Sequence, residues 1–134
     1  MSAGDDTAGF DAGCDTALLV IRDDRALSRE RIRLWLRESM AGRPDHDVLR
    51  VELVVGELLD NARRYGQPRY VVELVLDRHT GISTIRVRNR APRSTAGWVP
   101  AAGLSIVEAL SEQWGVVSME DRTTVWVKVR FAAV

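Results

Sequence analysis

The sequence has few of the residues that stabilise small secreted domains or anchor a chain in a membrane. Cys14 is the only cysteine in 134 residues, so no internal disulfide can form, and the disulfide-rich class of secreted domains is excluded. No apolar run approaches the roughly 18–20 residues of a membrane span. The N-terminus also lacks the basic-then-apolar order of a signal peptide. We therefore expect a cytoplasmic protein without a membrane partner.

An excess of either charge is also missing. The 19 basic and 19 acidic residues argue against a generic nucleic-acid binder, because such a protein would carry a basic excess. Lys128 is the only lysine, and this preference for arginine is typical of a GC-rich genome. The length and an apolar content of 46% suit one globular domain. We expect this domain at residues 16–134, after a flexible acidic tail at residues 1–15.

Hydrophobic periodicity predicts helices and strands along the whole domain. The predicted helices are 27–41, 46–65 and 104–114, and the predicted strands are 16–22, 69–77, 83–90, 116–119 and 123–131. This order predicts an α+β fold, a two-layer α/β sandwich in which a mixed, mostly antiparallel sheet carries helices on one face. The segment 91–103 has no periodicity, and loops of this length are more often functional than accidental.

Residues that favour helix ends stand at most of the predicted boundaries. Asp24 or Ser28 is expected to cap the first helix, because both side chains can accept a hydrogen bond from a free backbone N–H. Gly66 is expected to end the second helix as its C′ residue. The third helix should end at Gly115.

The second predicted helix carries two polar residues at an unusual place. At 100° per residue, its apolar side chains cover one broad side, and Asp60 faces solvent on the other. Glu57 and Asn61 lie one turn apart, where the apolar stripe meets solvent. A carboxylate and a carboxamide placed there could share one ligand, such as a metal ion or a water, or could simply mark the edge of the stripe.

Two further residues suggest a site near that helix. Asn89 is on the core face of the alternating strand 83–90, together with Ile85 and Val87, so its amide needs partners. The amide either bonds the backbone or faces a ligand. Gly103 stands where the long loop enters the third helix, and a helix N-terminus offers free N–H groups that suit a phosphate. Together these residues suggest a cleft bordered by the loop.

The motifs resemble those of a known family. "ELLDNARRYG" resembles the N box of the GHKL (Bergerat-fold) ATPases, whose pattern is Glu, three residues, then Asn-Ala. "AGLSIVEALSEQWGV" is similar to the Gly-Leu-x-Ile-Val helix after the ATP lid, and "TTVWVKVRF" is similar to the closing Lys-Thr-Val-Trp strand. The order and spacing agree from about residue 16 to 131. The subgroup that looks most similar is the stand-alone serine kinases that act as anti-sigma factors, which are abundant in actinomycetes.

The resemblance implies a role for individual residues. Asn61 would coordinate the Mg²⁺ that bridges the ATP phosphates, and Glu57 would act as general base or orient the attacking hydroxyl. Asn89 falls where the family has its adenine-binding Asp. The remaining cofactor-binding residues would be Gly103 and Leu104 at the phosphate and Thr124 near the adenine.

The sequence departs from the family pattern at two places. Asn89 stands within "NRAPR", where the family has Asp-x-Gly-x-Gly, and neither glycine is present. An amide oxygen can still accept a bond from the adenine amino group but lacks a charge, so weaker ATP binding is expected. Before Gly103 the chain has "AAGL" in place of Gly-Arg-Gly-Leu. Tyr65 replaces a frequent His of the subgroup.

Two functions follow from the resemblance. The first is an ATP-binding anti-sigma-factor-like regulator, a serine/threonine kinase that phosphorylates an anti-sigma-factor antagonist and sequesters a sigma factor. The alternative is a non-catalytic binding module of the same fold that acts by protein–protein interaction with weak or no nucleotide binding. Members of the subgroup often dimerise through the first helix and strand, so a homodimer is possible. The basic row Arg29, Arg33 and Arg37 is either a solvated face or a partner surface.

Overall fold

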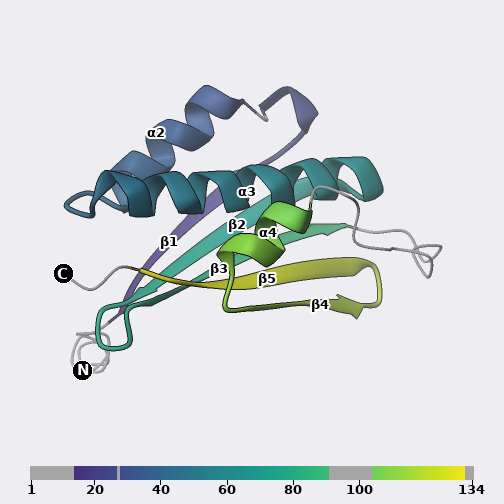
Figure 1. Cartoon of the computed structure of the whole chain (residues 1–134). Helices are drawn as coiled ribbons and strands as arrows, with labels where there is room; N and C mark the ends of the chain where they lie inside the picture. The colour runs from purple at the N-terminus through teal and green to yellow at the C-terminus, as the bar shows by residue number, and fades with distance from the viewer. Residues whose placement is uncertain (1–13, 27, 91–103, 132–134) are drawn as a thin grey trace, which may run out of the picture.

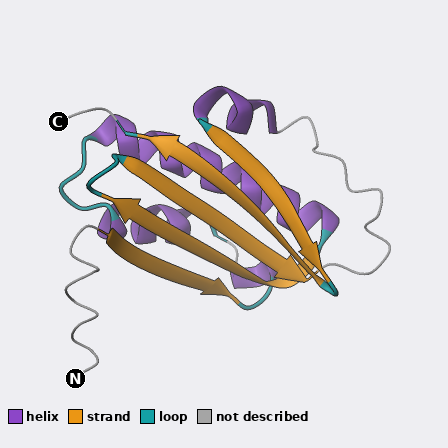
Figure 2. Ribbon diagram, turned by 90° about the horizontal axis from the view of Figure 1, so that it is seen from below, coloured by secondary structure: helices purple, strands orange, loops and turns teal. Residues whose placement is uncertain are grey.

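The computed structural model describes residues 14–26, 28–90 and 104–131, which form one antiparallel sheet with helices on one side. The elements in chain order are β1 (Cys14–Ile21), the 3-10 turn η2 (Asp24–Ala26), α2 (Arg29–Ser39), α3 (Asp45–Tyr65), β2 (Gln67–Asp77), β3 (Ile82–Arg90), α4 (Leu104–Leu110), β4 (Gln113–Met119) and β5 (Arg122–Arg130). The strand order across the sheet is β1-β2-β3-β5-β4, and every pairing is antiparallel. Figures 1 and 2 show the helices packed on a single face of the sheet, so the predicted α+β sandwich is confirmed.

The core lies between α3 and the inner face of the sheet. The apolar stripe of α3 contributes Val51, Val54 and Leu58, all of which are buried. Alternate residues of β3 and β5 point toward the helices, as the period of two in a strand requires. The buried residues of these two strands include Ile85, Val87, Asn89, Thr123, Val125, Val127 and Val129. The inward direction predicted for Asn89 is therefore confirmed.

A tight hairpin joins β2 to β3 and sets their register. Asp77 Oδ1 accepts hydrogen bonds from the backbone N–H groups of His79 and Thr80, at 2.9 and 3.3 Å. Gly81 has a φ of +73°, in the left-handed region that glycine adopts without strain. The turn places Asp77 opposite Ile82, which confirms the predicted hairpin at residues 78–81.

The ends of the first two helices agree with expectation in position. Ser28 caps α2, because its side chain accepts a hydrogen bond from the backbone N–H of Arg31 at 3.4 Å. Gly66 ends α3, but its φ of −139° is extended rather than left-handed. The left-handed conformation usual for a C′ glycine therefore does not explain the glycine at this position. A Cβ at residue 66 would lie 1.7 Å from Asn89 Nδ2, so the position needs a glycine because β3 comes so close.

The third helix is shorter than predicted. It ends at Leu110, and β4 already begins at Gln113, so the expectation of a helix as far as Gly115 was wrong. The backbone N–H of Glu112 donates to the carbonyl oxygen of Lys128 at 2.8 Å, which draws the chain onto β5. Gly115 pairs with Trp126, and a Cβ on this glycine would lie 2.7 Å from the indole. The glycine thus leaves room for a tryptophan and does not end a helix.

Other predictions concern the N-terminal tail, the long segment 91–103 and the absence of a membrane span. Residues 14 and 15, the end of the predicted tail, belong to β1, and residues 1–13 lie outside the described part. The long segment 91–103 also lies outside it. Within the described residues, no helix combines the length and the apolar character needed to cross a membrane.

Candidate functional site

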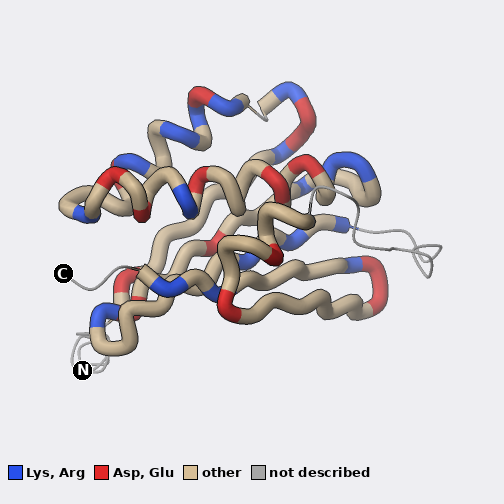
Figure 3. Tube along the Cα trace, in the orientation of Figure 1, with Lys and Arg blue, Asp and Glu red and all other residues tan. Residues whose placement is uncertain are grey.

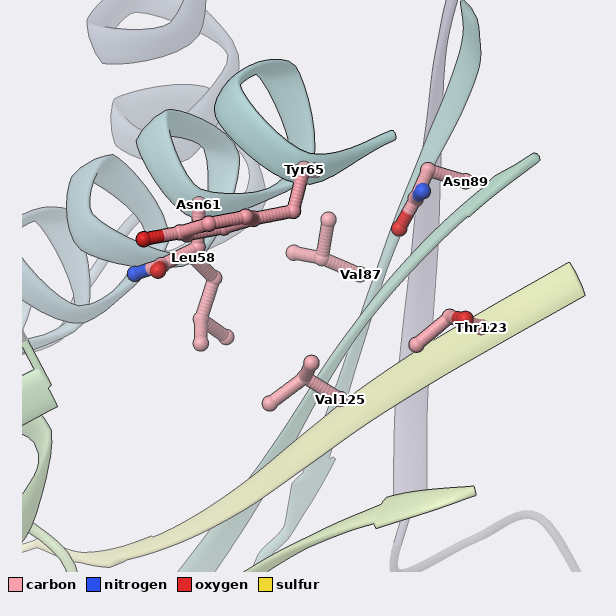
Figure 4. Close-up of a pocket in the computed structure, with 8 residues that line it drawn as sticks. Leu58, Asn61, Tyr65, Val87, Asn89, Thr123 and Val125 are labelled. Carbon is pink, nitrogen blue, oxygen red and sulfur yellow. The ribbon is translucent and has the colours of Figure 1, made fainter. Parts of the chain in front are cut away.

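A small pocket lies between the C-terminal half of α3 and the inner faces of β3 and β5 (Figure 4). Its volume of about 10 Å³ has room for roughly one water molecule. The lining residues are Leu58, Asn61, Ala62, Tyr65, Val87, Asn89, Thr123 and Val125. The pocket therefore brings Asn61 and Asn89, which are far apart in the sequence, to one place.

Asn61 contributes a buried amide from α3. Its side chain is 3% exposed, and Nδ2 donates to the backbone carbonyl oxygen of Glu57 at 3.0 Å. Oδ1 is buried and has no hydrogen-bond partner among the described residues. Such an acceptor costs about 1–3 kcal/mol when it stays unsatisfied. An oxygen held in this way suits a cation or a hydrogen-bond donor from a ligand.

Asn89 contributes a second amide, fixed in one orientation. Its Nδ2 donates to the backbone carbonyl oxygen of Arg90 at 2.8 Å, next to the space left by Gly66. The opposite end of the amide, Oδ1, points toward Val87 and the pocket (Figure 4). Of the two alternatives for this amide, the backbone bond thus occupies the nitrogen, and the oxygen remains on the pocket side.

The threonine in the pocket is Thr123 rather than Thr124. Thr123 is buried, pairs directly with Asn89 across the sheet, and has its hydroxyl 3.4 Å from that of Ser118. Thr124 is the next residue of β5 and therefore faces the other side of the sheet. The sequence could have indicated Thr123, because Thr123 and Val125 are two residues apart in a strand and therefore face the same side of the sheet.

Tyr65 is a pocket residue whose position the sequence did not indicate. Its ring extends from the end of α3 back toward Asn61, above Leu58 (Figure 4). The side chain is 38% exposed, so one side of the ring faces solvent. The pocket is too small for a purine, and the ring of Tyr65 is one of the groups that enclose it.

Glu57 borders a different hollow. A groove of about 400 Å³ runs between α2 and α3, and Glu57 and Asp60 line it together with Arg29 and Arg33. Arg33 Nε donates to Glu52 at 3.0 Å within this groove. Glu57 and Asn61 thus meet through the backbone bond and not in one pocket. A shared ligand for the two side chains remains a prediction.

A tyrosine of β2 holds the turn η2, which precedes α2, against the sheet beside this groove. The hydroxyl of Tyr70 donates to Asp24 Oδ1 at 2.6 Å, and Asp24 lines the groove. Burial, followed by this bond to a carboxylate, raises the pKa of Tyr70 well above its usual range. Tyr70 therefore stays a neutral donor, and the turn η2 remains attached to β2.

The predicted phosphate-binding end is only partly described. Gly103 lies outside the described residues, and Leu104 is the first residue of α4. Across residues 14–26, 28–90 and 104–131, no three His, Cys, Asp or Glu side chains gather as a metal site. The buried Oδ1 of Asn61 is nevertheless a ligand type that Mg²⁺ accepts, since this ion often uses few protein ligands besides phosphate oxygens. The residues fit Mg²⁺ held mainly by a nucleotide.

Comparison with known proteins shows a similarity in fold. No protein-family model matches the chain, and no curated protein matches its sequence. Among solved structures, the chain is similar to the crystal structure of the RsbU and RsbW domains of Rv1364c from Mycobacterium tuberculosis, with a TM-score of 0.66 and 21% identity. The match covers 87% of this chain and 32% of that chain, so the present chain spans about a third of that protein. The chain has the two-layer α/β sandwich of RsbW-like GHKL domains.

Proposed function

We propose that the chain is an ATP-binding, anti-sigma-factor-like regulator that acts as a serine/threonine kinase. The observation that supports this most directly is the pairing of two amide oxygens in one pocket. Asn61 Oδ1 is buried without a partner among the described residues, and Asn89 Oδ1 faces the same pocket from β3. Asn61 stands at the N-box position of the family that the sequence resembles, and Asn89 stands at the position of its adenine-binding Asp.

Each residue has a proposed part in binding or chemistry. Asn89 Oδ1 accepts a hydrogen bond from the adenine amino group, and Thr123 takes the place expected for Thr124 beside it. Asn61 Oδ1 would hold Mg²⁺, and this ion would neutralise charge on the phosphates. Glu57 accepts the proton of the attacking hydroxyl from the side of the α2–α3 groove. Gly103 and Leu104 offer backbone N–H groups to the phosphates.

The proposed partners follow from the same fold relationship. The protein substrate is an anti-sigma-factor antagonist, and the sequestered protein is a sigma factor, both in the cytoplasm. All three arginines of the basic row are exposed, and two of them, Arg29 and Arg33, line the groove beside Glu57. This position supports the proposal that a protein substrate approaches Glu57 past these arginines. Co-purification from the native host, followed by mass spectrometry, would identify both partners.

The pocket volume favours a second candidate function. A cavity of about 10 Å³ is too small for a purine while Tyr65 stays in place. A non-catalytic module of the same fold would keep this pocket closed and act through protein contacts alone. The two functions differ in whether the ring of Tyr65 moves aside for a nucleotide.

Calorimetric titration of the full chain with ATP, with and without Mg²⁺, tests the proposed function. We expect saturable binding that strengthens with Mg²⁺, loss of the Mg²⁺ effect in Asn61→Ala, and tighter binding in Tyr65→Ala. If no heat of binding is seen up to about 1 mM ATP, corresponding to about −4.1 kcal/mol, in either the wild type or Tyr65→Ala, the binding-module function replaces the kinase. With the antagonist in hand, Glu57→Ala should bind ATP and fail to transfer phosphate.

A further inference from the structure

A charged groove lies on the outer face of the sheet, the face without helices. Its volume is about 460 Å³, and Arg69, Arg88, Arg90 and Arg122 line it from β2, β3 and β5. Among the described residues that line the groove, Asp121 is the only acidic one, and its carboxylate is 3.9 Å from Arg90. Figure 3 shows basic segments at this end of the sheet, close to the turn between β4 and β5. The groove therefore carries a local positive excess on a chain with no net charge.

The strand register brings these positive charges close together, which destabilises the protein when no partner is bound. Arg90 lies directly opposite Arg122 on the neighbouring strand, so two like charges face each other. Arg88 has the same parity as Arg90 and makes no ion pair with the described residues. One step further along β3, Arg86 pairs with Glu73 at 2.7 Å. The outer face thus balances its charge in the middle and leaves it unbalanced at one end.

Exposed apolar side chains border the arginines. Met119 of β4 pairs with Arg122 and is 68% exposed, and Val117 pairs with Thr124 and is 47% exposed. Since paired residues point to the same face, both side chains lie beside the groove. Arginine and methionine are enriched in protein interfaces. This combination fits a protein segment better than a free phosphate.

Several other occupants fit the surface less well. A second copy of the chain would bring the same arginines against themselves if it docked face to face. A single-stranded nucleic acid would be expected to use aromatic side chains for stacking, and none lines the groove among the described residues. Charge and apolar content together favour an acidic partner protein.

We propose that this arginine groove binds an acidic protein segment whose carboxylates pair with Arg88, Arg90 and Arg122 and whose apolar residues cover Val117 and Met119. Guanidinium groups suit this role, because they bind carboxylates through two parallel hydrogen bonds. The groove is on the opposite face of the sheet from the Asn61 pocket. Asn89 of β3 borders both hollows, and the proposal for the outer groove does not rest on the proposed function.

Fluorescence anisotropy with the full chain tests the proposal. The probe is a labelled peptide that alternates Glu with Leu over about twelve residues, enough to cross the sheet at roughly 3.3 Å per residue. We expect saturable binding that weakens between about 50 and 300 mM salt. Arg90→Gln/Arg122→Gln should bind at least about tenfold more weakly. Arg31→Gln/Arg64→Gln removes the same charge from exposed positions on the helices and should bind like the wild type.

Control peptides and variants separate the other outcomes. A Gln-Leu peptide of the same length should not bind, and an oligothymidylate of equal charge should bind more weakly than the Glu-Leu peptide. Equal binding to both double variants, or preference for the oligothymidylate, would overturn the proposal. Met119→Ser tests the apolar border and should weaken binding severalfold. If the double variant does not fold, Arg88→Gln replaces it. Arg88 lies opposite the uncharged Thr124, so its substitution disturbs no charge pair between these strands.

Discussion

The two hollows at this end of the sheet share strand β3 but are built in opposite ways. On the inner face, Asn89 presents one amide oxygen to a pocket of about 10 Å³, and hydrogen bonding holds its nitrogen in place. On the outer face, Arg88 and Arg90 border an open groove of about 460 Å³ with little neutralising charge. Ligand binding in the inner pocket would depend on the positions of a few buried atoms. Binding in the outer groove would depend on the total charge of its arginines. Substitutions should therefore act differently on the two faces.

The largest effect is expected from Gly66→Ala, which tests the inner pocket. The new Cβ would lie 1.7 Å from Asn89 Nδ2 and 2.8 Å from the carbonyl oxygen of Arg90, so both the side chain and the backbone of β3 must shift. We expect a loss of about 3 kcal/mol in the free energy of unfolding, as for other overpacked sites. Urea unfolding followed by circular dichroism measures it.

Gly56→Ala is the matched control for this change. Gly56 lies within α3, and a Cβ there meets nothing within 4 Å. An alanine should therefore leave stability unchanged or raise it by up to about 1 kcal/mol. Equal stabilities of the two variants would show that the approach of Asn89 to Gly66 is not a constraint.

A smaller loss is expected from Asn89→Asp, although aspartate is the residue of the resembled family. One carboxylate oxygen would replace Nδ2 and face the carbonyl oxygen of Arg90, now 2.8 Å from that nitrogen. Two acceptors cannot bond each other, so we expect a loss of about 2 kcal/mol in the free energy of unfolding near neutral pH. An increase in both stability and ATP affinity would contradict the orientation described for Asn89.

Asn61→Leu should change stability in the opposite direction. The leucine removes a buried oxygen that has no partner among the described residues, and it keeps the branched shape of the side chain. We expect a gain of about 1 kcal/mol in the free energy of unfolding together with loss of Mg²⁺-dependent nucleotide binding. Asn61→Ala, which leaves a cavity, should lose stability instead. If leucine also destabilises the protein, the oxygen of Asn61 is satisfied in solution.

The smallest effect concerns the outer groove. Arg122→Gln removes a like charge opposite Arg90 and should raise the free energy of unfolding by about 0.5 kcal/mol at low salt. Arg86→Gln removes the pair with Glu73 and should lower it by a similar, small amount. Both differences should shrink as salt increases, since the charges are exposed. Chemical unfolding at two salt concentrations measures both, and effects of the same sign would contradict the proposed imbalance.

Local patterns in the sequence were sufficient to predict most of the fold and one side of the site. The period of two in β3 placed Asn89 on the core face. Helical periodicity placed Asn61 where the apolar stripe of α3 meets solvent, and the structure buries it. The same period places Thr123 inward, but the motif resemblance directed attention to Thr124. For β5, alternation thus indicates the residue that lines the pocket, and the role of Thr124 stays a prediction.

Features that depend on contacts between distant segments could not be read from local patterns. The need for Gly66 arises only where the end of α3 meets β3, and α4 ends early because β4 pairs with β5. The small pocket depends on the side-chain position of Tyr65, which no spacing of residues determines. Charge opposition between Arg90 and Arg122 likewise requires the register of two strands that are separated by a helix.

The position of Asn89 between two outward arginines also limits how this gene can evolve. A substitution in β3 changes one face at a time, because neighbouring residues of a strand point in opposite directions. Insertion of one codon between Ile85 and Arg88 would reverse every later side chain of the strand. It would send both arginines into the apolar layer and turn the asparagine out to solvent. Homologous genes should therefore vary in the composition of this strand and keep its length.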